Sequence, residues 1–112
     1  MPVSAQAAVM GAMKMGDIGQ SHWVTEFENR VADYVGVKYC IATSSGTMAD
    51  AVAVAAMAKK HNRFTFVVPA LTFIAHPNSV LYNGLKLQFV DVNTDWTMNV
   101  GEALRYKDTA IA

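Results

Sequence analysis

The 112-residue sequence predicts an α/β fold with a small, mainly parallel sheet of three to four strands and flanking helices. Short apolar runs of strand length alternate with helix-length segments along the chain. The run from Phe64 to Val68 is almost continuously apolar, which is typical of a strand covered on both faces. No internal repeat or low-complexity linker interrupts the alternation. We therefore expect a single domain, residues 1–112, with one modest core.

Two helices are expected in the first third of the chain. Val3 to Met15 is rich in alanine and methionine, which favour helix, and Gly16 to Gln20 breaks the pattern. Ser21 is a suitable N-cap for a second helix that runs to Gly36. Apolar side chains recur every three or four residues in this segment, and charged ones fall between them. The pattern predicts an amphipathic helix that ends at glycine.

A strand, a polar turn and a helix are expected next. Lys38 to Thr43 has β-branched and aromatic character and is too short for a stable helix, so it is predicted to be a strand. Ser44-Ser45-Gly46 forms the turn. The alanines from Thr47 to Lys60 favour a helix, and the two lysines at its end complement the negative end of the helix dipole. His61-Asn62 is expected to end this helix.

The remaining segments complete the alternation of strands and helices. Pro69 ends one strand, Pro77 fits the first turn of the following helix, and Gly84 closes that helix. The expected elements are a strand at 64–68, a helix at 77–83, a strand at 85–92, a short helix at 100–106 and a strand fragment from residue 109. Because the chain finishes on this apolar fragment, we expect it to be a truncated piece of a longer chain.

Composition excludes several classes of function. Acidic and basic residues balance to a formal net charge of zero, without the basic excess of a nucleic-acid-binding protein. No apolar run approaches the ~20 residues that cross a bilayer, and the N-terminus lacks the pattern of a secretory leader, so no membrane contact and a cytoplasmic location are expected. The single cysteine excludes a disulfide framework within the chain, and no metal-ligand spacing is present.

The turn Ser45-Gly46-Thr47 is the first candidate site. In an α/β sheet, ligands bind at the carboxyl ends of strands, where a helix N-terminus offers free backbone N–H groups. Gly46 would let an anion approach the backbone closely, and the hydroxyls of Ser45 and Thr47 would add donors for phosphate oxygens. The same residues would also serve as an ordinary helix cap. Both interpretations stay open on these residues alone.

The segment that follows the strand at 64–68 is the second candidate. Phe73 would stack on a planar ligand at the same edge of the sheet, or would be an ordinary core residue. His76 fits a solvated loop histidine, because nothing nearby gives it the spacing of a metal ligand or a catalytic triad. Asp91 ends a third strand and fits a turn or cap carboxylate.

Taken in order, several short motifs resemble one known family. They are Gly16-Asp17-Ile18-Gly19, Val24-Thr25-Glu26-Phe27-Glu28, Tyr34-Val35-Gly36-Val37-Lys38-Tyr39, Ser44-Ser45-Gly46-Thr47, Pro69-Ala70-Leu71-Thr72-Phe73-Ile74-Ala75, and Gly84 with Phe89-Val90-Asp91-Val92. This order and spacing resemble the DegT/DnrJ family of pyridoxal-phosphate-dependent nucleotide-sugar aminotransferases. The match extends from about Gly16 to the last residue, and it implies part of the large domain of a type I pyridoxal-phosphate (PLP) enzyme.

The resemblance also implies an activity and a set of site residues. Members of the family transfer an amino group, usually from glutamate, to a keto sugar attached to a nucleotide, and a minority carry out dehydration instead. By matching position, the segment Ser45, Gly46, Thr47 and Met48 would hold the cofactor phosphate, and Phe73 would stack on its pyridine ring. Asp50 and His76 depart from the apolar residue and the threonine that are common at these positions.

The resemblance further implies that the chemistry needs residues beyond this segment. Relatives place the lysine that condenses with the cofactor, and the carboxylate beside its ring nitrogen, past position 112, so we expect no catalytic residue here and no transamination by this chain alone. They also separate the strand at 38–43 from the other strands, so we expect uncovered apolar faces and a homo-oligomer. The alternatives are a stand-alone module that binds another phosphate ligand, and a folded remnant that only self-associates.

Overall fold

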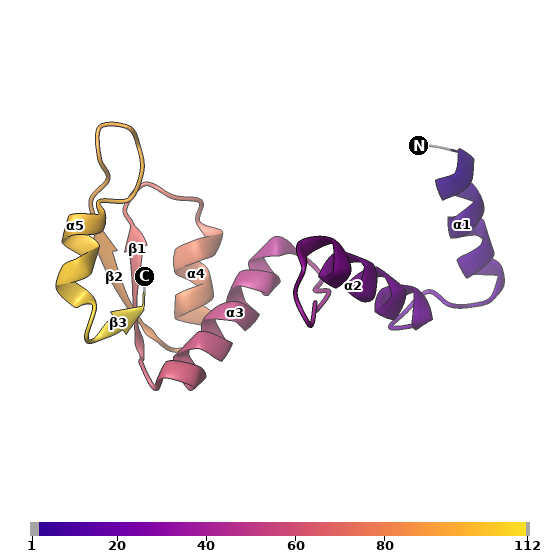
Figure 1. Ribbon diagram of the computed structural model, residues 1–112, viewed down its shortest axis with the longest axis horizontal. Coiled ribbons are helices and arrows are strands. Elements are labelled where there is room, and N and C mark those ends of the chain that lie inside the picture. The colour runs from indigo at the N-terminus through magenta and orange to yellow at the C-terminus, as the bar shows by residue number, and fades with distance from the viewer. Residues whose placement is uncertain (1–2, 112) are drawn as a thin grey trace. The chain divides into compact units, whose positions relative to one another are not determined.

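The computed structural model describes residues 3–111. The chain divides into two compact units, and the boundary between them along the sequence lies between Ala42 and Thr43. The first unit holds two helices, and the second holds a three-stranded sheet with helices on both faces (Figure 1). The predicted α/β class, with a small parallel sheet and flanking helices, is confirmed.

The first unit contains helices α1 (Val3–Lys14) and α2 (His22–Val35). Ser21 caps α2 as predicted, because its hydroxyl oxygen accepts a hydrogen bond from the Trp23 N–H at 3.3 Å. Gly36 ends the helix in the left-handed conformation, with φ of 77°, which a glycine adopts without steric cost. Both predicted helices are therefore confirmed.

The strand predicted at 38–43 is wrong. This segment forms no ladder with any strand of the described chain, and Tyr39 and Ile41 are exposed. The Ala42 N–H donates instead to the Glu28 carboxylate at 2.7 Å. β-Branched and aromatic residues favour a strand only when a neighbouring strand is available to pair with, and the sheet of this chain lies in the other unit.

The second unit is built on three parallel strands. They are β1 (Thr65–Pro69), β2 (Lys86–Val90) and β3 (Ala110–Ile111), arranged in the order β2-β1-β3. The register pairs Thr65 with Lys86 and Pro69 with Val90 on one side of β1, and Thr65 with Ala110 on the other. Arg63 ties the β3 edge to the start of β1, because its guanidinium donates to the Lys107 and Ala110 carbonyls at 2.7 and 3.0 Å.

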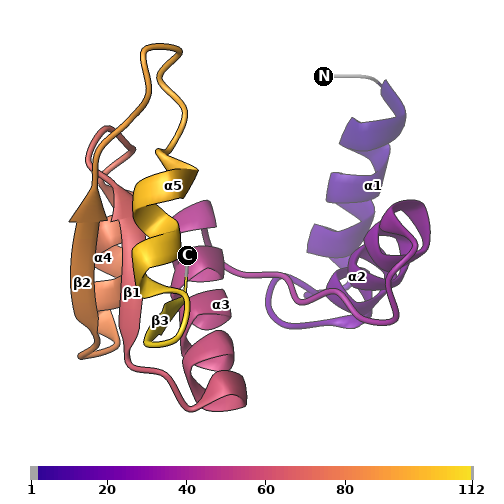
Figure 2. The ribbon, with the colours of Figure 1, turned by 60° about the vertical axis from the view of Figure 1, so that its left-hand side comes forward.

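The central strand β1 separates two small cores, because its alternate side chains point to opposite faces of the sheet. Phe66 and Val68 pack with Ala58 of α3 (Gly46–His61) and Val80 of α4 (Ala75–Tyr82). On the other face, the core is formed by Val67, Val90, Ala103 and Ala110. Ala103 ends α5 (Val100–Ala103), which continues into the 3-10 helix η1 (Leu104–Tyr106). Figure 2 shows α5 on the face of the sheet opposite α3 and α4.

The predicted bounds of these elements hold to within two residues, and β2 is two residues shorter at its end than predicted. The strand ends at Val90 because the following residues turn into a hairpin, in which Val92 and Met98 form an antiparallel bridge. The hydroxyl and backbone N–H of Thr97 both donate to the Asp95 carboxylate, and these two hydrogen bonds lower the pKa of Asp95. The hairpin projects beyond the carboxyl edge of the sheet (Figure 2).

Many large apolar side chains are exposed in both units. On α2, three of the apolar side chains that recur every three or four residues, Trp23, Phe27 and Tyr34, are exposed, and Ala32 is buried. This agrees with the expectation that helix faces would be left uncovered. None of the helices described in residues 3–111 is both long and apolar enough to span a bilayer.

Replacing Val80 by alanine should destabilise the second unit. Val80 of α4 is 1% exposed and packs against Phe66 and Val68 of β1. The loss of its two methyl groups should lower the free energy of unfolding by about 2 kcal/mol. Urea unfolding followed by the amide NMR signals of β1 and β2 measures this. Leu81→Ala, one residue along and 56% exposed, should change the free energy by less than about 0.5 kcal/mol. Equal effects of the two changes would contradict the core assignment.

Candidate functional site

The N-terminus of α3 combines a helix cap with two free backbone donors. Ser45 is the N-cap, and its hydroxyl oxygen accepts a hydrogen bond from the Met48 N–H at 3.3 Å. The Ala49 N–H donates to the Ser45 carbonyl and begins the helical ladder. The N–H groups of Gly46 and Thr47 have no partner among the described residues, and they carry the positive end of the helix dipole. Capping and anion binding are therefore compatible at this turn.

Gly46 is not required by the fold. It does not adopt the left-handed conformation, and a Cβ atom added to it would meet no heavy atom within 4 Å. A side chain there would instead project into the open space beside the free N–H groups. A glycine at this position leaves the backbone accessible, which is what close approach by a phosphate requires. The residue type thus fits a phosphate cradle better than a purely structural turn.

Phe73 lies in the loop between β1 and α4, at the carboxyl edge of the sheet. It is 70% exposed, so its interpretation as a core residue is wrong. An exposed aromatic ring at this edge offers a flat apolar surface to a planar ligand. Phe73 lines one cleft of about 400 Å³ together with Gly46, Thr47, Asp50, Ala75 and His76. That volume is within the ~300–1,000 Å³ range of small-molecule sites.

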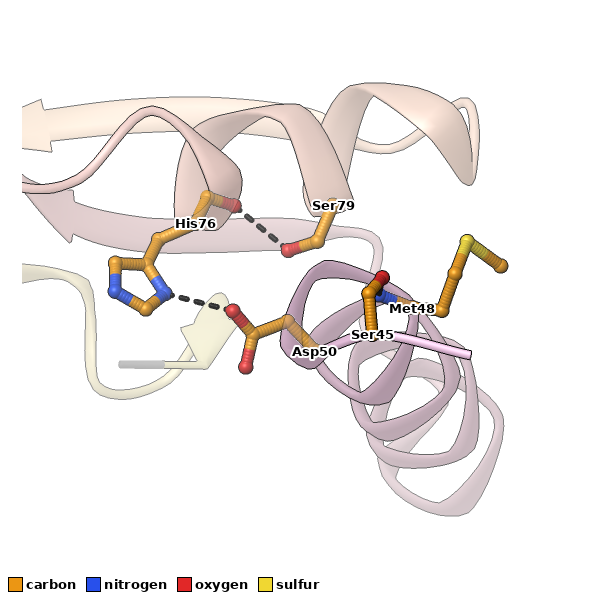
Figure 3. A network of polar contacts seen from close by, with 5 residues as sticks. All are labelled: Ser45, Met48, Asp50, His76 and Ser79. Carbon is orange, nitrogen blue, oxygen red and sulfur yellow. Dashed lines mark hydrogen bonds and ion pairs between the residues drawn. The ribbon is translucent and has the colours of Figure 1, made fainter. Parts of the chain in front are cut away.

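Asp50 and His76 meet across this cleft. His76 Nδ1 lies 2.9 Å from Asp50 Oδ2, and the two side chains are 50% and 38% exposed (Figure 3). The sequence favoured a loop histidine, but the structure places His76 in the first turn of α4. The Ser79 hydroxyl donates to the His76 carbonyl at 2.7 Å. The two helices are also joined at the other end of α4, where the Asn83 amide donates to the Ala51 carbonyl, next to Asp50, at 2.9 Å.

The structure brings together some of the predicted site residues and separates others. Gly46, Thr47 and Phe73 line the same cleft, whereas Ser45 and Met48 do not. Ser45 acts as the cap, and the Met48 side chain points away from the Asp50–His76 pair (Figure 3). The pairing of Asp50 with His76 was missed because the two residues lie on different helices, and neither shows a local motif.

Asp91, another residue that the sequence singled out, does not line this cleft. Asp91 follows β2, and its carboxylate accepts a hydrogen bond from the Val92 N–H at 2.8 Å, as expected of a turn carboxylate. Within residues 3–111, no group of three or more His, Cys, Asp or Glu side chains is arranged to hold a metal ion.

Known proteins that resemble this chain are nucleotide-sugar enzymes. It is 42% identical over 81 residues to GDP-perosamine synthase of Caulobacter vibrioides, which covers 72% of this chain and 21% of that relative. It is 34% identical over 88 residues to the UDP-2-acetamido-2-deoxy-3-oxo-D-glucuronate aminotransferase of Pseudomonas aeruginosa, which covers 78% of this chain and 24% of the relative. A UDP-4-amino-4,6-dideoxy-N-acetyl-beta-L-altrosamine transaminase of Campylobacter jejuni is 36% identical over 72 residues, or 64% of this chain and 19% of the relative.

The chain thus spans about a fifth to a quarter of the length of these relatives. A sequence model of one protein family also matches this chain. The match covers residues 3–106, nearly the whole chain. This match includes the α3 turn and the loop that carries Phe73, and it confirms the resemblance drawn from the motifs. The chain belongs to the DegT/DnrJ/EryC1/StrS aminotransferase family.

Proposed function

We propose that this chain supplies part of the cofactor site of a PLP-dependent aminotransferase that acts on a nucleotide-linked keto sugar, usually with glutamate as amino donor. One observation carries the proposal: Gly46 and Thr47, whose N–H groups are free, line the same cleft as the exposed residue Phe73. An anion site beside an exposed aromatic ring matches a ligand that is a phosphate ester of a flat pyridine. The names of the relatives support the substrate class.

Each of these residues would have a separate role. The Gly46 and Thr47 N–H groups would donate to phosphate oxygens, and the Thr47 hydroxyl would add a third donor. Ser45 would keep the helix terminus in place through its cap, which also engages the Met48 N–H. Phe73 would cover one face of the pyridine ring. When bound, PLP supplies the aldehyde that exchanges an amino group and the ring that withdraws electrons from the reacting carbon.

We further propose that no lysine of these 112 residues condenses with the cofactor, so that the chain alone does not transaminate. The positions of several lysines support this. Lys59 and Lys60 lie in the last turn of α3, at the end of the helix opposite Gly46. Lys86 begins β2, at the amino edge of the sheet, whereas Phe73 follows the carboxyl end of β1. An imine-forming lysine has to reach the aldehyde of a ligand that these residues hold at the other end of their elements.

A second candidate function is a binding module for another phosphate ligand, without catalysis. The free N–H groups of Gly46 and Thr47 favour it equally, since they would donate to the oxygens of any accessible phosphate. The two candidates differ in the use of Phe73. A site for PLP needs the ring surface, whereas a site for inorganic phosphate does not.

Self-association is the third part of the proposal. Exposed large apolar residues occur in both units, among them Phe27 and Tyr34 of α2 and Phe89 of β2. Soluble proteins seldom leave this much apolar surface in water. Association with a second copy of the chain would bury part of it.

Binding of pyridoxine 5'-phosphate tests the cleft without the complication of an aldehyde that reacts with lysines. The 112-residue chain should bind it more tightly than it binds pyridoxine, with NMR shifts at the Gly46 and Thr47 amides. Gly46→Val should weaken binding of the phosphate ester about tenfold or more. The new side chain would block the charge-assisted hydrogen bonds from the backbone N–H groups to the phosphate. Phe73→Ala should weaken binding of both pyridoxine 5'-phosphate and pyridoxine roughly two- to tenfold, because both ligands carry the ring.

Gly11→Val is the matched control for Gly46→Val. Gly11 also has nothing within 4 Å of an added Cβ, but it lies in α1, outside the cleft. Binding of the phosphate ester should be unchanged in this variant. If wild-type protein binds both ligands equally, the phosphate cradle is wrong. If Phe73→Ala has no effect and inorganic phosphate competes fully, the second candidate function is favoured.

Reduction with borohydride tests the role of the lysines. After incubation with PLP and reduction, peptide mass spectrometry should show only scattered labelling, and absorbance should reveal no discrete bound cofactor. A single lysine labelled to completion, with labelling abolished by Gly46→Val, would contradict the proposal that these residues contain no lysine that condenses with the cofactor.

Sedimentation velocity tests self-association. The weight-average sedimentation coefficient should rise as protein concentration increases, and a moderate concentration of urea, below the unfolding transition, should reduce it. A coefficient that stays at the value of a 12.1 kDa monomer over the whole range would show that the exposed apolar residues do not associate.

A further inference from the structure

Asp50 places a negative charge beside the proposed phosphate site. It follows Gly46 by four residues on α3, so the two positions are neighbours on one face of the helix. Both line the cleft that Thr47 and Phe73 also line. A carboxylate one helical turn from the free N–H groups repels a phosphate and lowers its affinity for the helix terminus. The sequence therefore combines an anion site with a group that opposes anions.

His76 is placed to offset this charge. Its Nδ1 lies 2.9 Å from Asp50 Oδ2, so the two side chains form an ion pair when the imidazole is protonated. When the imidazole carries both protons, the pair has no net charge. The contact also keeps the carboxylate on the side of α3 that faces α4. The cleft then meets less negative potential than an unpartnered Asp50 would give it.

The position of His76 is fixed by the packing of α4 on α3. The Ser79 hydroxyl donates to the His76 carbonyl, and Asn83 bridges α4 to the Ala51 carbonyl, next to Asp50. Ala75 and Ser79, on either side of His76 along α4, are buried. The imidazole therefore reaches Asp50 from a rigid support and needs no rearrangement of the helix.

We propose that His76 is a positioning residue that masks the charge of Asp50 and thereby maintains phosphate affinity at Gly46 and Thr47. This inference rests on the proposed function, because it concerns the same cleft. It differs from a simple structural link between the two helices. If the pair only fastened α3 to α4, removing either partner would weaken binding to a similar extent. If His76 masks a charge, removing the charge removes the need for His76.

The test is a double-mutant cycle on the 112-residue chain, with pyridoxine 5'-phosphate and pyridoxine as probes in NMR titrations at constant pH. His76→Ala should weaken binding of the phosphate ester roughly three- to tenfold and leave the affinity for pyridoxine unchanged, because only the ester carries the phosphate. Asp50→Asn should bind the ester at least as tightly as wild type. The double variant should match Asp50→Asn, so that loss of the carboxylate rescues the loss of His76.

Salt gives a second readout that a structural link would not move. The screening length falls from about 30 Å at 0.01 M ionic strength to about 3 Å at 1 M. The ratio of wild-type to His76→Ala affinity should therefore approach one at high salt. Amide spectra of each variant show whether the fold is retained.

His22→Ala is the matched control. His22 forms a similar pair with Asp17, with Nδ1 2.6 Å from Oδ2, and neither residue lines the cleft. This variant should leave the affinity for the ester unchanged. If Asp50→Asn weakens binding as much as His76→Ala, or if the double variant is not rescued, the inference is overturned while the proposed function stands. If wild-type protein does not prefer the ester to pyridoxine, the proposed function fails, and the inference fails with it.

Discussion

Burial of strand β1 on both faces is the constraint on which the second unit depends. Phe66 and Val68 have to be covered by α3 and α4, while Val67 has to be covered by the segment around Ala103. A strand in this position pairs on both edges, and β1 does so with β2 and β3. Because both pairings are parallel, the strands share one carboxyl edge, and the loop after β1 emerges there. The site follows from this arrangement.

The packing of α4 on α3 brings the N-terminus of α3 and the Phe73 loop into one cleft. The two helices cover the same face of the sheet and are linked near both ends of α4, by His76 and by Asn83. A helix cap and an anion site compete for the same N–H groups only if the cap uses all of them. Ser45 engages the Met48 N–H and leaves those of Gly46 and Thr47. Capping thus stabilises the helix without closing the site.

Elements with local determinants were predictable from the sequence. Ser21 and Gly36 define α2, and Asn62, with φ of 52°, ends α3 where a helix exit was expected. The segment at 38–43 was not predictable in the same way, because a strand is defined by its partner as well as by its residues. The Asp50–His76 pair depends on tertiary packing, so the sequence indicated only a solvated loop histidine at 76 and a departure from the usual apolar residue at 50. Phe73 was ambiguous for a similar reason, since sequence does not distinguish an apolar ring in a core from one at a site.

Gly46 and Asp50 place an accessible backbone and a negative charge close together on α3. Asp50 follows the first turn of the helix, near the positive end of the dipole that would attract a phosphate. The two anions therefore compete for one positive potential. In our proposal, His76 on α4 removes this conflict, because its contact with Asp50 offsets the carboxylate charge and leaves the end of the dipole at Gly46. The glycine, which neither its φ nor its packing requires, keeps that end open to a ligand.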